Sequence, residues 1–242
     1  NVIDSPADKE VDKALSQTTK ALASYYRPAM EKGEMTFNKA SHKAFVEQGA
    51  GSGFNERLVH LLKNPSPDAK EIKTIKEHLI TRGTAEEITT LVNALNGSSP
   101  VKSIDATSAM LEALVSRAGS VNSRGVIRRL PRLVRLLDHK NENIVQLTAE
   151  TLGAWKVNQA APYLINLLED GDTNSALRQA AAVGLAGIGG LENLKKLSGL
   201  AGENYDVETR YASLQGLMNL DMDKGVEAMT ILFAEDPGQA NP

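Results

Sequence analysis

The sequence predicts an all-α solenoid of stacked helix pairs, because one helical pattern returns at a nearly constant spacing over residues 130–219. Two columns of small residues show the repeat, with a shift of 31 and then 32 residues in each. The alanine column contains Ala149, Ala180 and Ala212, and the glycine column contains Gly153, Gly184 and Gly216. Pro131 and Pro162 are also 31 residues apart. A repeat of this length is typical of small helical units that bury their apolar faces only against one another.

The composition supports helices and narrows the classes of function. Aromatic residues make up 4% of the 242 residues, which suits thin, closely packed helices better than a β-sandwich. The net charge is −3, so the chain lacks the basic excess that is typical of nucleic-acid-binding proteins. The absence of cysteine excludes disulfides, thiolate catalysis and cysteine-ligated zinc within these residues. No apolar run reaches the ~20 residues that cross a bilayer, and no signal peptide is recognisable.

The first 53 residues predict a separate helical section. Ser5-Pro6 has the character of a helix start, and Pro28 should end or redirect that helix. A short helix over residues 40–48 is followed by a glycine-rich run at 49–53. These helices do not share the register of the later repeats. We therefore expect a helical section over 1–53 that packs on a solenoid over 54–242.

From Phe54 onward the sequence predicts a right-handed superhelix of about five helix pairs. Two pairs occupy residues 54–83 and 84–119, and the second opens on a capping box formed by Thr84 and Glu87. The three clearer pairs are Val126–Leu137 with Ile144–Trp155, Ala160–Leu168 with Ser175–Ile188, and Leu191–Leu200 with Val207–Leu220. An unpaired final helix covers residues 224–234. The turns within the clearer pairs, at 138–143, 169–174 and 202–206, are rich in Gly, Asn and Asp.

The glycine column requires a physical reason, since a glycine inside a helix costs about 1 kcal/mol relative to alanine. Its three members occupy the same step of three second helices and lie beside the alanine column. This pattern predicts that a neighbouring helix passes close by at each glycine. A leucine at Gly184 should therefore destabilise the protein by overpacking.

Two second-helix segments carry a family resemblance. Residues 177–185 read Leu-Arg-Gln-Ala-Ala-Ala-Val-Gly-Leu, and residues 209–217 read Thr-Arg-Tyr-Ala-Ser-Leu-Gln-Gly-Leu. They resemble HEAT repeats of the short, bilin-lyase-like type, whose second helix often reads Val-Arg-x-Ala-Ala-x-x-Ala-Leu-Gly. Arg178 and Arg210 match the arginine of this motif, whereas Leu147 replaces it in the first clear unit. The resemblance extends from about Phe54 to Ala234, and it implies an α-α superhelix.

Two further stretches resemble a narrower family, the HEAT segment of large exported bacterial proteins. They are residues 25–37, with the following Lys43-Ala44-Phe45 helix, and the segment from Leu220 to Pro237. In that family a sugar-dehydrogenase-like β-propeller precedes the HEAT segment, a cytochrome c domain commonly follows it, and Trp usually stands at the position of Tyr26. The resemblance implies an extracytoplasmic or periplasmic parent, a membrane-bound dehydrogenase with a haem domain. The lack of an initial methionine and the loop-like end likewise lead us to expect a piece of a multidomain protein.

An arginine cluster is the most conspicuous candidate for binding. It contains Arg124, Arg128, Arg129, Arg132 and Arg135. On a helix, Arg128, Arg132 and Arg135 would share one face, opposite the apolar residues. Such a stripe suits a phosphate group or an acidic partner surface. The alternative is a solvated helix face whose charge is balanced by acids of adjacent units.

No other sequence pattern indicates a catalytic, metal-binding or ligand-binding site. Trp155 ends a second helix and is expected to pack between repeats rather than to stack on a ligand. The four histidines are scattered without the spacing of metal ligands. The aspartate pairs at 170–172 and 221–223 fit turns and helix caps better than calcium loops. With no nucleophile motif and no phosphate-binding glycine loop, we predict no catalytic, cofactor-binding or metal-binding residue, and no cofactor.

The sequence thus favours a non-catalytic scaffold or spacer whose partners are proteins or neighbouring domains of the same chain. Arg128, Arg132 and Arg135 are the predicted partner-binding residues, and neither nucleic acid nor membrane insertion is expected. One alternative is an independent protein-binding module. Another is a HEAT-like enzyme, either a bilin lyase or a DNA-repair glycosylase, which would require a groove with convergent acidic and aromatic residues. The partner, the oligomeric state and the cellular compartment stay open.

Overall fold

The computed structural model describes residues 51–97, 102–120, 124–202 and 204–235, together with scattered positions between 14 and 46. No strand occurs in these ranges. The chain divides into two compact units, Asn1–Leu61 and Leu62–Pro242, and the division falls within helix α4 (Gly51–Lys63). Within the first unit, the Tyr26 hydroxyl donates to the Thr19 carbonyl at 3.0 Å. The predicted helix start at Ser5-Pro6 and the predicted break at Pro28 lie outside the described residues.

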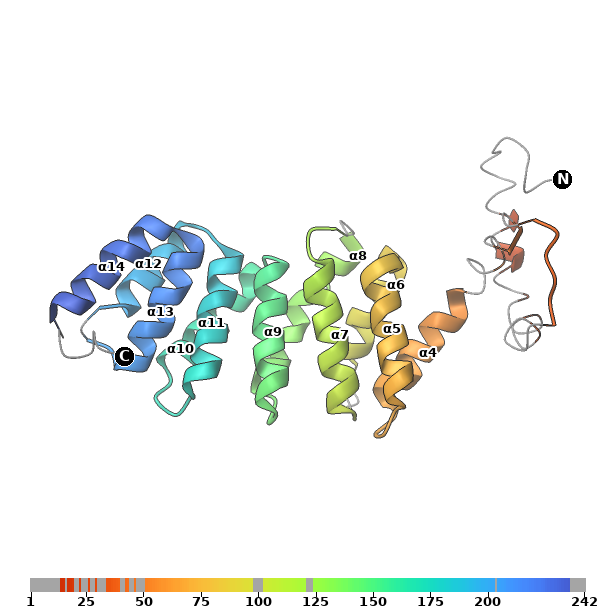
Figure 1. Ribbon diagram of the computed structural model, residues 1–242, viewed down its shortest axis with the longest axis horizontal. Coiled ribbons are helices and arrows are strands. Elements are labelled where there is room, and N and C mark those ends of the chain that lie inside the picture. The colour runs from red at the N-terminus through yellow and green to blue at the C-terminus, as the bar shows by residue number, and fades with distance from the viewer. Residues whose placement is uncertain are drawn as a thin grey trace. The chain divides into compact units, whose positions relative to one another are not determined.

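The second unit is a succession of short helices, and it confirms the predicted all-α superhelix (Figure 1). Its α-helices and 3-10 helices are α5 (Ala69–Arg82), α6 (Ala85–Leu95), α7 (Ile104–Arg117), α8 (Arg124–Ile127), η2 (Leu130–Asp138), α9 (Glu142–Ala154), η3 (Asn158–Ala160), α10 (Ala161–Glu169), α11 (Ser175–Ile188), α12 (Leu191–Leu200), α13 (Val207–Leu220) and α14 (Met222–Glu235).

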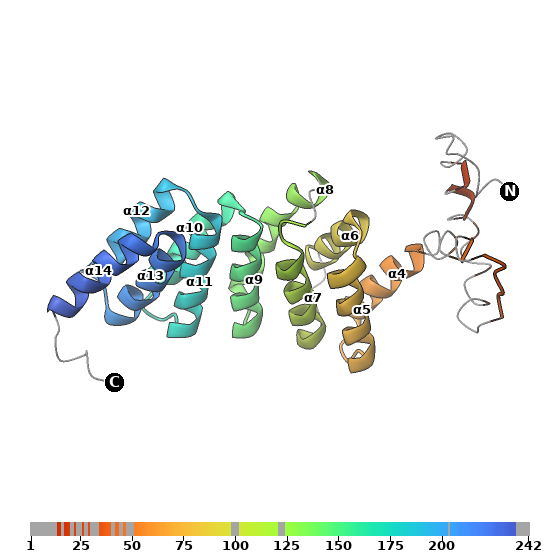
Figure 2. The same cartoon turned by 45° about the horizontal axis from the view of Figure 1, so that its top comes forward.

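The helices form two layers. The second helices of successive pairs, α5, α7, α9, α11 and α13, stand side by side, and each contacts the next (Figures 1 and 2). The first helices lie behind them: η2 packs on α9, α10 on α11, and α12 on α13. Fully buried leucines such as Leu133, Leu164 and Leu197 fill the space between the layers. Each pair therefore completes its core only with its neighbours, as expected of a solenoid.

Local sequence sets where the second helices begin. A polar residue in extended conformation precedes each of them and accepts a hydrogen bond from a backbone N–H of the first turn. These N-cap residues are Asp68, Ser103, Asn141, Asn174 and Asp206. The predicted capping box of α6 is confirmed, because the Thr84 N–H donates to Glu87 at 2.8 Å and the Glu87 N–H donates to Thr84 at 3.2 Å.

The structure corrects the single helix predicted over Val126–Leu137. The short helix α8 ends at Ile127, residues 128–129 form a turn, and the 3-10 helix η2 begins at Leu130. Pro131 supplies the reason, since inside an α-helix its ring would clash with the carbonyl four residues earlier and it has no N–H to donate. Pro131 instead lies in the first turn of η2, where proline is tolerated.

The glycine column lies where the second helices approach most closely, as predicted. A Cβ atom at Gly184 would lie 2.8 Å from the backbone oxygen of Ala149 in α9. A Cβ atom at Gly216 would lie 2.9 Å from the backbone oxygen of Ala182 in α11. Real Cβ atoms essentially never approach other atoms so closely, so hydrogen at these positions is what lets α9, α11 and α13 pack at this separation.

Candidate partner-binding surface

The three arginines predicted to bind a partner all lie on the surface of the first-helix layer. Arg128 is in the turn before η2, and Arg132 and Arg135 are in η2, each with an exposed side chain. Residues three apart align along a 3-10 helix, so Arg132 and Arg135 share one line of η2. The opposite side of η2 is buried, through Leu130, Leu133, Val134, Leu136 and Leu137.

Arg135 is engaged in the fold. Its Nη2 donates to the backbone oxygens of Leu95, at 2.6 Å, and Gly97, at 2.7 Å, at the C-terminal end of α6. In return, the Asn96 side-chain amide donates to the Arg129 carbonyl at 2.9 Å. The Leu95 carbonyl is one of the last carbonyls of α6, which have no partner within the helix, and a guanidinium also complements the negative end of the helix dipole. Arg135 therefore anchors η2 to α6.

Arg128 and Arg132 differ from Arg135, because neither guanidinium has a hydrogen-bond or ion-pair partner in the part of the chain that the structure describes. Arg128 follows Ile127, whose side chain is 50% exposed at the end of α8. The structure thus leaves two open guanidinium groups, one in the turn and one in η2, and an exposed aliphatic side chain directly precedes the first of them in the chain. Arg128 and Arg132 lie in the turn before η2 and in η2, which the hydrogen bonds of Arg135 and Asn96 join to α6 of the preceding repeat.

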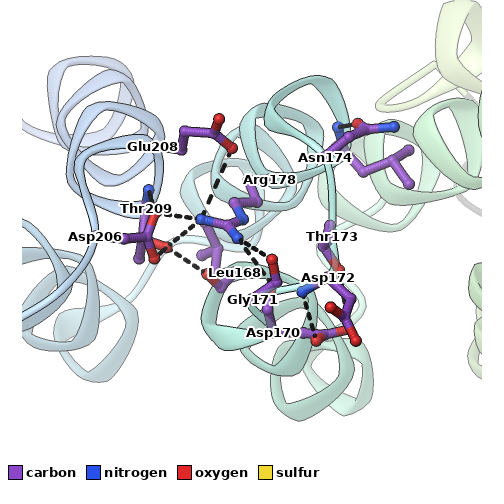
Figure 3. A network of polar contacts seen from close by, with 11 residues as sticks. Leu168, Asp170, Gly171, Asp172, Thr173, Asn174, Arg178, Asp206, Glu208 and Thr209 are labelled. Carbon is purple, nitrogen blue, oxygen red and sulfur yellow. Dashed lines mark hydrogen bonds and ion pairs between the residues drawn. The ribbon is translucent and has the colours of Figure 1, made fainter.

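A second polar network joins two repeats at the first turns of the second helices α11 and α13 (Figure 3). Arg178 of α11 is only 3% exposed, and its Nη2 donates to the carbonyls of Asp170, at 3.0 Å, and Gly171, at 3.1 Å. Its Nη1 donates to the Asp206 carboxylate and, at 2.9 Å, to the Thr209 hydroxyl. Arg178 therefore connects the turn of its own pair to the first turn of α13, and its contacts are all to groups of the protein.

The sequence identified Arg178 only as a motif position, and its partners lie 28 and 31 residues further along the chain. The repeat length of 31–32 residues could have indicated these two partners, because they lie about one repeat after Arg178. Asp206 is the N-cap of α13, and the equivalent positions Asn141 and Asn174 cap α9 and α11. A motif arginine one repeat before an acidic cap is the available signal. It does not reveal that the guanidinium is buried.

Asp206 has an unusual ionisation equilibrium. Partial burial alone would raise the pKa of its carboxyl group. The net effect is opposite, because the Thr209 N–H and hydroxyl and the Arg178 guanidinium stabilise the carboxylate and lower the pKa below the ordinary value of 3.8. A lowered folded-state pKa contributes stability above the unfolded-state value, and that contribution is lost as the pH falls through the folded-state value.

We expect Asp206→Asn to remove this pH-dependent contribution. Asparagine caps helices as well as aspartate does, so the substitution removes mainly the charge beside Arg178. The wild-type protein should be the more stable of the two at pH 6, and the difference should shrink as the pH falls below about 4. Urea denaturation of both proteins at pH 6 and pH 3 measures it. A difference that stayed constant across this range would contradict the assigned role of the carboxylate.

Other residues singled out in the sequence have structural contacts. Trp155 caps the C-terminal end of α9, and its Nε1 donates to the Leu114 carbonyl of α7 at 2.8 Å, which confirms its packing between repeats. The aspartate pairs serve as turns and caps, because Asp170 accepts from the Asp172 N–H at 3.1 Å and Asp221 from the Lys224 N–H at 3.2 Å.

The described ranges contain no group of three or more His, Cys, Asp or Glu side chains placed to hold a metal ion. Within the same ranges, no helix combines the length and the apolar character needed to span a bilayer.

A family model supports the repeat assignment for part of the chain. Residues 130–218 match the family model described as HEAT repeats. No curated protein is significantly similar to the chain. Similar solved structures include a designed armadillo repeat protein with 19% identity and a TM-score of 0.43, covering 91% of this chain and 97% of that one. Another is a designed armadillo repeat protein in complex with the peptide (KR)4, with 20% identity, a TM-score of 0.45 and the same coverages. The family match confirms the HEAT resemblance for its own span, and none of these comparisons supports the narrower resemblance to exported dehydrogenases.

Proposed function

On the premise that residues 130–218 are HEAT repeats, we propose that the protein is a non-catalytic scaffold that binds a protein partner on its first-helix layer. The main contact residues are Arg128 and Arg132. The observation that carries the proposal is the pair of open guanidinium groups in and directly before an anchored element, with the half-exposed Ile127 next to Arg128 in the chain.

The local geometry favours binding over a purely solvated role. The anchoring bonds of Arg135 and Asn96 fix the backbone that carries Arg132, so less conformational freedom is lost when a partner binds. Arginine presents a planar set of donors that pairs with carboxylates through two parallel hydrogen bonds. A half-exposed aliphatic side chain adds apolar area to the same surface.

The charge of the surface selects the chemistry of the partner. Two unpaired cations attract a carboxylate-rich segment, and the overall charge of −3 opposes general binding to nucleic acid. We therefore infer an acidic protein segment as the ligand. Since the interaction is between exposed charges, it should weaken as the ionic strength rises.

Panning a random dodecapeptide display library on the wild-type protein tests this function. We expect enrichment of peptides rich in Asp and Glu, and synthetic copies should bind in fluorescence anisotropy at low salt. In the double variant Arg128→Glu/Arg132→Glu, affinity for these peptides should fall at least tenfold, because attraction becomes repulsion at two positions.

The matched control is Lys70→Glu/Lys73→Glu, which changes the net charge equally but on exposed positions of α5. This variant should retain most of the affinity. Enrichment of neutral or basic peptides would contradict the proposal, and so would equal binding of acidic peptides to the wild-type protein and the Arg128→Glu/Arg132→Glu variant.

We also propose that this solenoid is the spacer of a larger exported redox protein, as the resemblance of residues 25–37 and 220–237 implies. Sequencing the gene on both sides of the present segment tests the idea. A downstream Cys-x-x-Cys-His motif, together with an upstream signal peptide and strand-rich domain, would support it. A start codon just before Asn1 and a stop codon just after Pro242 would rule it out and favour an independent binding module.

A further inference from the structure

An exposed aromatic residue lies in the first helix of the pair that follows η2. Tyr163 of α10 has 50% of its surface exposed, and no hydrogen bond of its hydroxyl is found among the described residues. It contributes to neither of the polar networks described above. A large aromatic side chain held on the surface of a helix provides apolar area and a planar face, which are the features enriched in binding sites.

The repeat places Tyr163 at the position equivalent to Arg132. Pro131 and Pro162 occupy the first turns of η2 and α10, so Arg132 and Tyr163 both directly follow the helix-initiating proline. The next residues, Leu133 and Leu164, are both fully buried. Each helix also packs on the second helix of its own pair, α9 or α11, and these two are in direct contact. Arg132 and Tyr163 therefore lie on the same outward face of successive repeats.

This outward face has a consistent composition. The positions equivalent to Arg128 and Arg135 are Gln159 and Asn166, and both are exposed. The only charged residue of α10 is Glu169 at its end, which pairs with Lys196 at 2.6 Å. The equivalent positions Asp138 and Glu169, at the C-terminal ends of η2 and α10, are exposed carboxylates, whereas the positions equivalent to Arg128, Arg132 and Arg135 carry none. The face thus passes from two cations to an aromatic ring and two amides.

We propose that Tyr163 is a specificity-determining contact for the acidic segment bound by Arg128 and Arg132, and that it recognises an apolar or aromatic side chain of that segment. The inference rests on the proposed binding function. It adds a second repeat to the surface that the ligand covers, and it adds a large apolar residue to the sequence of the ligand. The partner is a protein segment in which carboxylates are followed, at a defined spacing, by one large apolar residue.

The spacing follows from the geometry of stacked helices. The second helices α9 and α11, on which η2 and α10 pack, are in direct contact. Packed helices lie about 8–10 Å apart, so successive repeats are displaced by about this distance, and an extended peptide advances about 3.3 Å per residue. About three residues of an extended segment therefore separate the carboxylates at Arg132 from the side chain at Tyr163. A single aromatic pair contributes on the order of 0.5–1.5 kcal/mol, which corresponds to about a twofold to tenfold change in affinity.

Fluorescence anisotropy with two labelled peptides tests the inference on the full chain. The first peptide contains three glutamates, a Gly-Ser-Gly spacer and a phenylalanine, and the second has alanine in place of phenylalanine. The wild-type protein should bind the phenylalanine peptide about fivefold more tightly. Tyr163→Ala should remove that preference while leaving the alanine peptide unaffected. Tyr211→Ala, which removes an exposed tyrosine of α13 in the other layer, should preserve the preference.

The outcomes distinguish this inference from the function on which it rests. Equal affinity of the wild-type protein for the two peptides, with both lost in Arg128→Glu/Arg132→Glu, would overturn the role of Tyr163 and retain the scaffold function. Failure of both peptides to bind would overturn both proposals. Tighter binding of a single-stranded thymidine dodecamer, weakened by Tyr163→Ala, would replace the acidic protein segment with nucleic acid. The peptide preference of the wild-type protein needs no variant, so the test does not depend on the folding of Tyr163→Ala.

Discussion

Alanine in place of Gly184 is expected to lower the free energy of unfolding by about 2–3 kcal/mol. The added Cβ would lie 2.8 Å from the backbone oxygen of Ala149 and 3.1 Å from a methyl group of Leu164. A flexible side chain could move away, but the Ala149 oxygen belongs to the backbone of α9, so relief requires the two helices to separate. This penalty opposes the gain of about 1 kcal/mol that alanine normally brings to a helix. Leucine at Gly184 should be still more destabilising.

Chemical denaturation of the wild-type protein and the two variants measures this effect. The matched control is Gly199→Ala in α12, because a Cβ at that helical position meets no atom within 4 Å. Gly199→Ala should leave the stability unchanged or raise it by up to about 1 kcal/mol. An unchanged stability in Gly184→Ala would show that α9 and α11 do not approach as closely as the structure indicates.

Replacing the buried Arg178 with methionine is expected to cost about 2–4 kcal/mol. Methionine retains much of the length and apolar bulk of the side chain, so the loss comes mainly from polar contacts. The Gly171 carbonyl loses its donor, the Asp170 carbonyl keeps only the Thr173 N–H, and the Asp206 carboxylate loses its cation. Asp206 is largely exposed, so water can solvate its carboxylate when the guanidinium is removed. The expected loss of stability is therefore smaller than for a fully buried ion pair.

The second motif arginine, Arg210, provides the comparison. It occupies the equivalent position of the next repeat, but it is only half-buried, so water can compensate the polar groups that lose its guanidinium. Arg210→Met should therefore cost clearly less than Arg178→Met when both are measured by urea denaturation. Equal losses would mean that the motif position, rather than the network of Arg178, determines the contribution.

The repeat pattern was enough to predict most of the helices in the described ranges. Each second helix has an apolar stripe and a polar N-cap at nearly constant spacing, and both signals depend only on nearby residues. The single helix predicted over Val126–Leu137 was wrong, although the proline that prevents it, Pro131, was visible in the sequence. The apolar residues of this segment fit a helical period, but proline cannot occupy the interior of an α-helix. The break at residues 128–129 is the consequence.

The candidate site was predictable only in part. Arginine spacing indicated a basic face, and all three predicted residues are exposed. The spacing could not show that Arg135 donates to carbonyls 38 and 40 residues earlier, whereas Arg128 and Arg132 remain open. Tyr163 was not singled out either. Its significance comes from its equivalence to Arg132 across two stacked repeats.

The sequence by itself determined the helices, their pairing along the chain and the columns of glycine and alanine, because periodicity, capping and proline geometry act over a few residues. Only the tertiary structure decided which polar side chains form hydrogen bonds with other segments of the solenoid. Arg135 and Arg178 satisfy the carbonyls of other segments, while Arg128, Arg132 and Tyr163 are left at the surface. The reason is that a hydrogen bond joins groups that are close in space, and such groups need not be close in the sequence. Arg135 donates to carbonyls of the preceding repeat, and Arg178 connects the turn of its own pair to the N-cap of the next second helix, and no local pattern specifies these partners.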